Sequence, residues 1–161
     1  MTRHNSFLPV RWLWVLLLCS FAISAVAAER PLVTIKKLSG EEIAITRDQV
    51  AQLPIYTVNS SEPGREGAFR GPLLRDVLAL VGVNAQTIEI SAYDSYYVQI
   101  ERAYWADYDS ILATEREGVT MKIRDKGSLW LIFPWDKHTE LRNERFYNLS
   151  IWQIKEIKEL P

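Results

Sequence analysis

Cysteine is nearly absent from this sequence, since Cys19 is the only one among 161 residues. It lies inside an apolar run and follows Leu18, whereas lipid modification of a cysteine requires a small residue just before it. We therefore expect Cys19 to be removed with an N-terminal leader. The mature chain would then form no disulfide and would offer no thiolate nucleophile or thiolate metal ligand.

Histidine is also scarce, and only His138 lies outside the first few residues. A zinc-ligand pattern is therefore missing, and a serine triad would depend on this one histidine without any G-x-S-x-G turn. No glycine-rich phosphate loop of known spacing is present either. Asp136, His138 and Glu140 alternate and could hold a metal weakly if the segment is extended, but a solvated polar loop is the simpler interpretation. We expect no metal site and no resident cofactor.

The first 28 residues read as a leader. Basic residues precede an unbroken apolar run over residues 12–23, and small residues follow at Ala25 and Ala27. This layout is typical of a secretory signal peptide, and the run is shorter than the about 20 residues of a transmembrane helix. We predict cleavage after Ala27 or Ala28, a periplasmic or secreted protein, and no integral membrane span once the signal is removed. An uncleaved N-terminal anchor is the alternative.

The charge balance is mildly acidic. The chain has 19 basic and 20 acidic residues, and loss of Arg3 and Arg11 with the leader leaves 17 against 20, a net charge of −3. Together with export, this argues against a nucleic-acid partner. Residues 29–161 suffice for one domain.

The hydrophobic pattern predicts a single α+β domain that is richer in strand than in helix. A central, doubly buried strand is expected where an apolar run ends at Pro134, and a hairpin is expected to turn at Asp94 and Ser95. The expected strands are 33–38, 42–46, 55–60, 87–101 as a hairpin, 128–133 and a bulged tail over 150–160. Two helices are expected, a short one at 46–54 and a clearer one at 71–82. The second should have Pro72 at its first helical position and end at Gly82.

Several of these segments, in this order, resemble the oxidoreductase molybdopterin-binding domain, which has the sulfite-oxidase-like fold. The resemblance covers about residues 45 to 160. It rests on an F-x-G helix motif, an aromatic-bearing Asp-Gly-Tyr hairpin with Ser95 in place of the usual glycine, a glycine-to-proline apolar strand and a tryptophan in the final segment. The matching residues are Phe69, Gly71, Leu74, Val77, Leu78, Asp94, Tyr96, Gly127, Pro134 and Trp152.

The resemblance implies the fold more strongly than the activity. In catalytic members a cysteine thiolate ligates molybdenum, and the corresponding stretch here, residues 57–64, has none. A serine hydroxyl is a poor substitute, because its pKa is too high for easy ionisation. We therefore expect a non-catalytic domain, and molybdopterin enters only through the resemblance.

The candidate ligand-binding residues lie at the hairpin turn, after Pro134 and before the main helix. A tryptophan face beside cationic side chains suits a flat anionic ring. If the ligand lies near His138, its binding should strengthen as the pH falls towards about 6, because the histidine becomes protonated. Each residue also has a structural interpretation: Trp135 as a lid over the core, Arg142 as the partner of Glu140 or Glu144, and Arg70 as part of a solvated face. The candidates are Asp94, Tyr96, Tyr97, Trp135, His138, Arg142 and Arg70.

Three functions fit this pattern. The first is an exported binding, sensory or accessory domain for a small anionic ligand. The second is a subunit of a molybdopterin-dependent oxidoreductase that works with a redox partner without a cysteine ligand. The third is an interaction module that takes no small ligand and docks on another envelope protein through exposed aromatic side chains.

Overall fold

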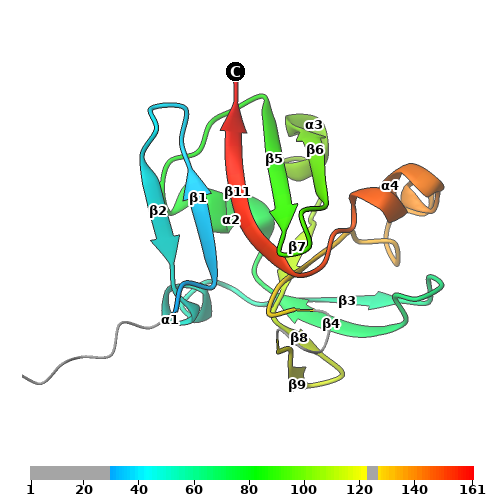
Figure 1. Ribbon diagram of the computed structural model, residues 1–161. Coiled ribbons are helices and arrows are strands. Elements are labelled where there is room, and N and C mark those ends of the chain that lie inside the picture. Colours follow the sequence, from blue (N-terminus) through cyan, green and yellow to red (C-terminus); the bar gives the residue numbers. More distant parts are fainter. Residues whose placement is uncertain (1–29, 123–126) are drawn as a thin grey trace, which may run out of the picture.

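A mixed five-stranded sheet forms one layer of the domain (Figure 1). The computed structural model describes residues 30–122 and 127–161. The strand order is β2 (Glu42–Ile45), β1 (Val33–Lys36), β11 (Ile154–Leu160), β5 (Thr87–Ala92) and β6 (Tyr97–Glu101). Only β1 and β11 run parallel, so the first and last described strands lie side by side. The expected β5–β6 hairpin is confirmed, and the expected strands β1 and β2 also pair with each other as a hairpin.

A four-stranded antiparallel sheet and a two-stranded sheet complete the β structure. The first has the order β3 (Tyr56–Ser60), β4 (Gly67–Gly71), β8 (Glu115–Arg116) and β9 (Val119–Thr120), and the second pairs β10 (Trp130–Ile132) with β7 (Ile111–Ala113). The other side of β10 is also occupied, because Leu131 N donates to Ile151 O at 2.9 Å and Trp130 bridges Trp152. β10 therefore has a neighbouring segment on each side, as expected for a central strand, although its sheet has only two strands.

Five short helical segments connect the strands in the part of the chain that the structure describes. They are α1 (Arg47–Ala51), α2 (Leu74–Ala79), α3 (Arg102–Trp105), the 3₁₀ helix η2 (Thr139–Leu141) and α4 (Glu144–Leu149). Thr46 caps α1 as expected, and Gln49 completes a capping box with it. Among the described residues, no helix combines the length and the apolar character that crossing a membrane requires.

The main helix is shorter than its sequence pattern predicts. Gly71 belongs to β4 and Pro72 precedes the cap residue Leu73, so Pro72 does not occupy the first helical position. The expected C-terminal cap is correct: Gly82 has φ 70°, and Val83 N donates back to Leu78 O at 3.1 Å. The predicted helix began at Gly71, but this residue pairs with Tyr56 of β3 and so belongs to β4.

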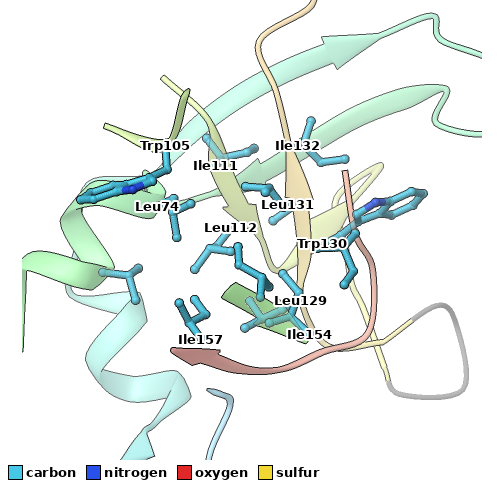
Figure 2. Packing of buried hydrophobic residues seen from close by; sticks show 14 of the residues in the cluster. Leu74, Trp105, Ile111, Leu112, Leu129, Trp130, Leu131, Ile132, Ile154 and Ile157 are labelled. Atoms are coloured by element: carbon cyan, nitrogen blue, oxygen red, sulfur yellow. The ribbon is translucent and has the colours of Figure 1, made fainter. Parts of the chain in front are cut away.

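The core gathers around β10: Figure 2 shows Leu129 to Ile132 close to Ile111 and Leu112 of β7 and to Ile154 of β11. Leu129, Leu131 and Phe133 lie on one face of the pleat, and Trp130 and Ile132 lie on the other. All five are at most 1% exposed. The prediction that this strand is covered on both faces is therefore confirmed. The tail strand is also bulged as expected, with a register shift between Ile154 and Glu156.

Candidate functional site

A cavity of about 280 Å³ lies where three segments distant in sequence meet. One wall is the β5–β6 turn, the second is the end of α4 with residues 150–152, and the third is the loop between β3 and β4. Figure 1 shows α4 beside the far end of the β3–β4 hairpin. The lining residues are Arg65, Ala92, Asp94, Tyr96, Tyr147, Asn148, Ser150, Ile151 and Trp152.

Arg65 supplies the only positive charge among these lining residues. It is half-buried, its Nη2 donates to Tyr147 O at 2.5 Å, and its guanidinium carbon lies 5.9 Å from the centre of the Tyr147 ring. Its Nε is buried without an acceptor, and among the described residues it forms no ion pair within 4.0 Å. Burial lowers the pKa of Arg65 because it penalises the charged form. The cavity therefore contains a partly desolvated cation that feels the charge of Glu62 but makes no ion pair with it within 4.0 Å, and Asp94 is the acidic residue of the opposite wall.

A buried carboxylate beneath the cavity fixes this wall in place. Glu62 is 7% exposed, its Oε2 accepts a hydrogen bond from the Tyr147 hydroxyl, and its Oε1 lies 3.4 Å from Arg142 Nε. The backbone N–H of Arg65 donates to Glu62 O at 2.8 Å. The hydrogen bond to Glu62, burial and the Glu62 charge, in that order, raise the pKa of Tyr147. Glu62 thus joins α4 to the loop that carries Arg65.

The β5–β6 turn forms the opposite wall through a short-range hydrogen bond. Asp94 Oδ1 accepts from Tyr96 N at 3.0 Å, and Ser95 between them has φ 71°. This left-handed conformation explains why the resembled family usually has glycine at that position. The Tyr96 hydroxyl donates to Asn148 O at 3.3 Å, which joins the turn to the end of α4.

Aromatic rings line much of the cavity. Trp152 meets Trp130 edge-on with ring centres 5.6 Å apart, and Tyr147 meets Trp135 with ring centres 5.8 Å apart. The second ring of each pair is buried in the core, so the ring that reaches the cavity is held from behind. Held rings of this kind can stack on a planar ligand at little cost in side-chain entropy.

The structure brings only part of the predicted site together. Asp94 and Tyr96 line the cavity as a pair. Arg142 lies behind it and pairs with Glu62, whereas the sequence suggested Glu140 or Glu144 as its partner. Trp135 requires a correction: it is 1% exposed and donates Nε1–H to Leu141 O at 3.0 Å. The chain after Pro134 does not carry it to an exposed rim, because η2 folds back over its ring.

The other three candidates lie outside the cavity lining. Tyr97 is 59% exposed on β6, and Arg70 pairs with Glu115 at 3.0 Å across β4 and β8. His138 packs edge-on against Tyr108 and pairs with Glu140 at 3.1 Å. The expected strengthening of binding at low pH through His138 therefore has no support from the position of this residue.

Sequence reasoning missed Arg65, Glu62 and Tyr147. Arg65 and Glu62 lie in a proline- and glycine-rich stretch that reads as an ordinary loop, and Tyr147 lies on a six-residue helix without a clear apolar period. The one available signal was Arg65 itself, an arginine inside the loop that corresponds to the metal-ligand segment of the resembled family.

The donor set does not fit a molybdenum centre of the resembled type. The segment that would carry the thiolate contains Ser60, whose Oγ accepts from Glu62 N at 3.1 Å, and the exposed Ser61. Asp136, His138 and Glu140 do not converge, since Asp136 accepts from Asn59 N at 3.2 Å. Within residues 30–122 and 127–161, no group of three or more histidine, cysteine or acidic side chains could hold a metal ion.

Comparison with known proteins supports the fold. No protein-family model and no curated protein matches the sequence. The structure matches the sulfane dehydrogenase SoxCD from Paracoccus pantotrophus with a TM-score of 0.60 and 15% identity, over 80% of this chain and 38% of that chain. This likeness confirms the expected strand-rich α+β fold and its similarity to the sulfite-oxidase-like fold. This chain spans well under half of that protein chain.

Proposed function

We propose that the chain is an exported, non-catalytic binding domain whose cavity takes a small anionic ligand with a flat ring. Arg65 carries the proposal, because it is a half-buried cation with an unpaired Nε and no ion-pair partner among the described residues. Glu62 and Tyr147 O compensate this charge only in part, and a bound anion would satisfy the Nε that they leave without an acceptor. The rings of Tyr147 and Trp152 would stack on the ligand body.

The non-catalytic part of the proposal rests on the donor chemistry of the site. Export rests on the leader pattern of residues 1–28, which lie outside the described residues. Elemental analysis of mature protein made in a cofactor-competent host should find no stoichiometric molybdenum. About one molybdenum per chain would instead support an oxidoreductase subunit. The intact mass of exported protein should correspond to a chain that starts at Ala28 or Glu29.

Ligand-induced stabilisation tests the binding itself. We expect pterin-6-carboxylate or a purine nucleotide to raise the melting temperature of the mature protein, and uncharged pterin to raise it much less. Arg65→Gln should weaken binding of the anionic probe about tenfold or more, because it removes a charge-assisted contact. Arg70→Gln is the matched control, since Arg70 pairs with Glu115 away from the cavity.

The pH dependence provides a second readout. No histidine is among the described residues that line the cavity, so binding should change little between about pH 6 and pH 8. If no anionic ring compound shifts the melting temperature, or if Arg65→Gln binds as well as the parent, the ligand proposal fails. The interaction-module interpretation would then be favoured, with the exposed Tyr96 and Tyr97 as its first candidates.

A further inference from the structure

A separate groove of about 440 Å³ lies between the start of β1, α1 and the segment that follows β9. Figure 1 shows α1 and the start of β1 at the end of the five-stranded sheet that is nearer to β8 and β9. None of the residues that line the groove lines the cavity beside Arg65. The lining residues are Arg30, Pro31, Leu32, Arg47, Tyr93, Thr120, Met121, Lys122 and Ser128.

The charge of this groove is one-sided. Among the described residues that line it, Arg30, Arg47 and Lys122 are basic and none is acidic. Several cations elsewhere are paired, as where Lys36 contacts Glu42 at 3.0 Å and Glu156 at 3.1 Å. The side chains of the three groove cations have no ion pair or hydrogen bond to any described residue. Since acids outnumber bases in the whole chain, this local positive charge does not reflect the overall composition.

The floor and edge of the groove are apolar and aromatic. Leu32 and Met121 are buried at its base, and the half-exposed ring of Tyr93 stands at one side. The Tyr93 backbone is fixed, because its N–H donates to Gln153 O at 3.1 Å. Thr120 and Ser128 add hydroxyl groups. An apolar base, a few polar groups and a volume of roughly 300–1,000 Å³ are typical of small-ligand sites.

We infer that this groove binds an organic phosphate whose body is apolar or aromatic. Two guanidinium groups and one ammonium carry three positive charges, which is more than one carboxylate needs and enough to neutralise a phosphate dianion. Arginine can contact a phosphate with two parallel hydrogen bonds. The apolar body would cover Leu32 and Met121 and contact the ring of Tyr93. A free small molecule and a lipid headgroup both carry this chemistry.

Calorimetric titration with phenyl phosphate tests the inference in an Arg65→Gln background, which removes the charge of the first cavity. We expect binding there, little binding of phenol, and weakening as salt rises. Arg30→Gln with Arg47→Gln should lower the affinity about tenfold or more. Lys137→Gln with Lys155→Gln is the matched control, because it removes the same charge from two exposed lysines outside the groove.

The outcomes separate this groove from the first cavity and separate the two ligand sources. Loss of all phenyl phosphate binding in the Arg65→Gln protein, or equal weakening by both double variants, would overturn the inference. Sedimentation with phosphatidylglycerol vesicles, compared with phosphatidylcholine vesicles, identifies the source. If the protein binds the anionic vesicles and the Arg30→Gln, Arg47→Gln double variant does not, the ligand is a lipid headgroup. If the protein binds phenyl phosphate but not the vesicles, the ligand is a free phosphate.

Discussion

Tyr147 on α4 donates its hydroxyl hydrogen to the buried Glu62 in the β3–β4 loop, although 85 positions separate the two residues. This contact orients the Tyr147 ring at the cavity and holds the loop that carries Arg65. Removal of the hydroxyl would leave Glu62 with Arg142 as its remaining charged partner. The two residues therefore link the stability of the domain to the shape of its proposed binding site.

The first prediction concerns alkaline pH. The folded pKa of Tyr147 is raised above the ordinary value, mainly by the hydrogen bond to Glu62. A raised folded pKa stabilises the protein fully below the unfolded pKa of about 10, and this contribution is lost as the pH rises through the folded pKa. Tyr147→Phe should therefore be less stable than the parent at pH 7, and the difference should shrink above about pH 10.

Urea unfolding of both proteins across this pH range measures the effect. Tyr96→Phe is the control, because it removes the hydroxyl of an exposed tyrosine that donates only to Asn148 O. A parent and a Tyr147→Phe variant that differ by a constant amount at every pH would contradict the prediction.

The second prediction separates core from ligand site at two tryptophans. Trp135→Phe removes the donor to Leu141 O, so the protein should lose about 1–3 kcal/mol of unfolding free energy while ligand affinity changes little. Trp152→Phe changes a ring at the cavity wall and should lower ligand affinity more than stability. Urea unfolding and ligand titration on both variants test this. If Trp135→Phe lowered ligand affinity more than Trp152→Phe, Trp135 would have to be counted among the ligand-binding residues.

The third prediction concerns close packing at Gly71. A Cβ built there would lie 2.0 Å from the backbone oxygen of Leu112, so the strand and its neighbour would have to move apart. Gly71→Ala should cost about 3 kcal/mol or more of unfolding free energy. Gly64→Ala, where no heavy atom lies within 4 Å of the added carbon, should cost only about 1–2 kcal/mol, because of its φ of 74°. Similar costs at both positions, measured in urea, would argue against this packing.

The fourth prediction is a stabilising change in the β5–β6 turn. Ser95 has φ 71°, a conformation that costs an L-residue about 1–2 kcal/mol and costs glycine little. Glycine loses more entropy on folding, so Ser95→Gly should gain up to about 1 kcal/mol of unfolding free energy. Ser91→Gly on β5 is the control and should be destabilising. A less stable Ser95→Gly protein would show that the Ser95 side chain has a stabilising role of its own.

Much of the fold follows from local patterns in the sequence. Alternation predicted the hairpins, Thr46 marked the start of α1, Gly82 marked the end of the main helix, and the apolar run before Pro134 predicted a doubly buried strand. These features depend on neighbours within a few residues, so sequence spacing carries them. The order of such segments also predicted the strand-rich α+β fold.

The site depended on contacts that no local pattern encodes. Gly71 belongs to a strand because it pairs with Tyr56 of β3, and Leu112 of β7, in another sheet, leaves no room there for a side chain. Trp135 is buried because η2 folds back over it, although its position after a proline suggested an exposed loop. Arg65 becomes a candidate anion ligand only because α4 packs on its loop and Glu62 is already engaged by Tyr147 and Arg142. Sequence determined which residues carry a positive charge, and tertiary packing decided which of them line a cavity without an ion-pair partner.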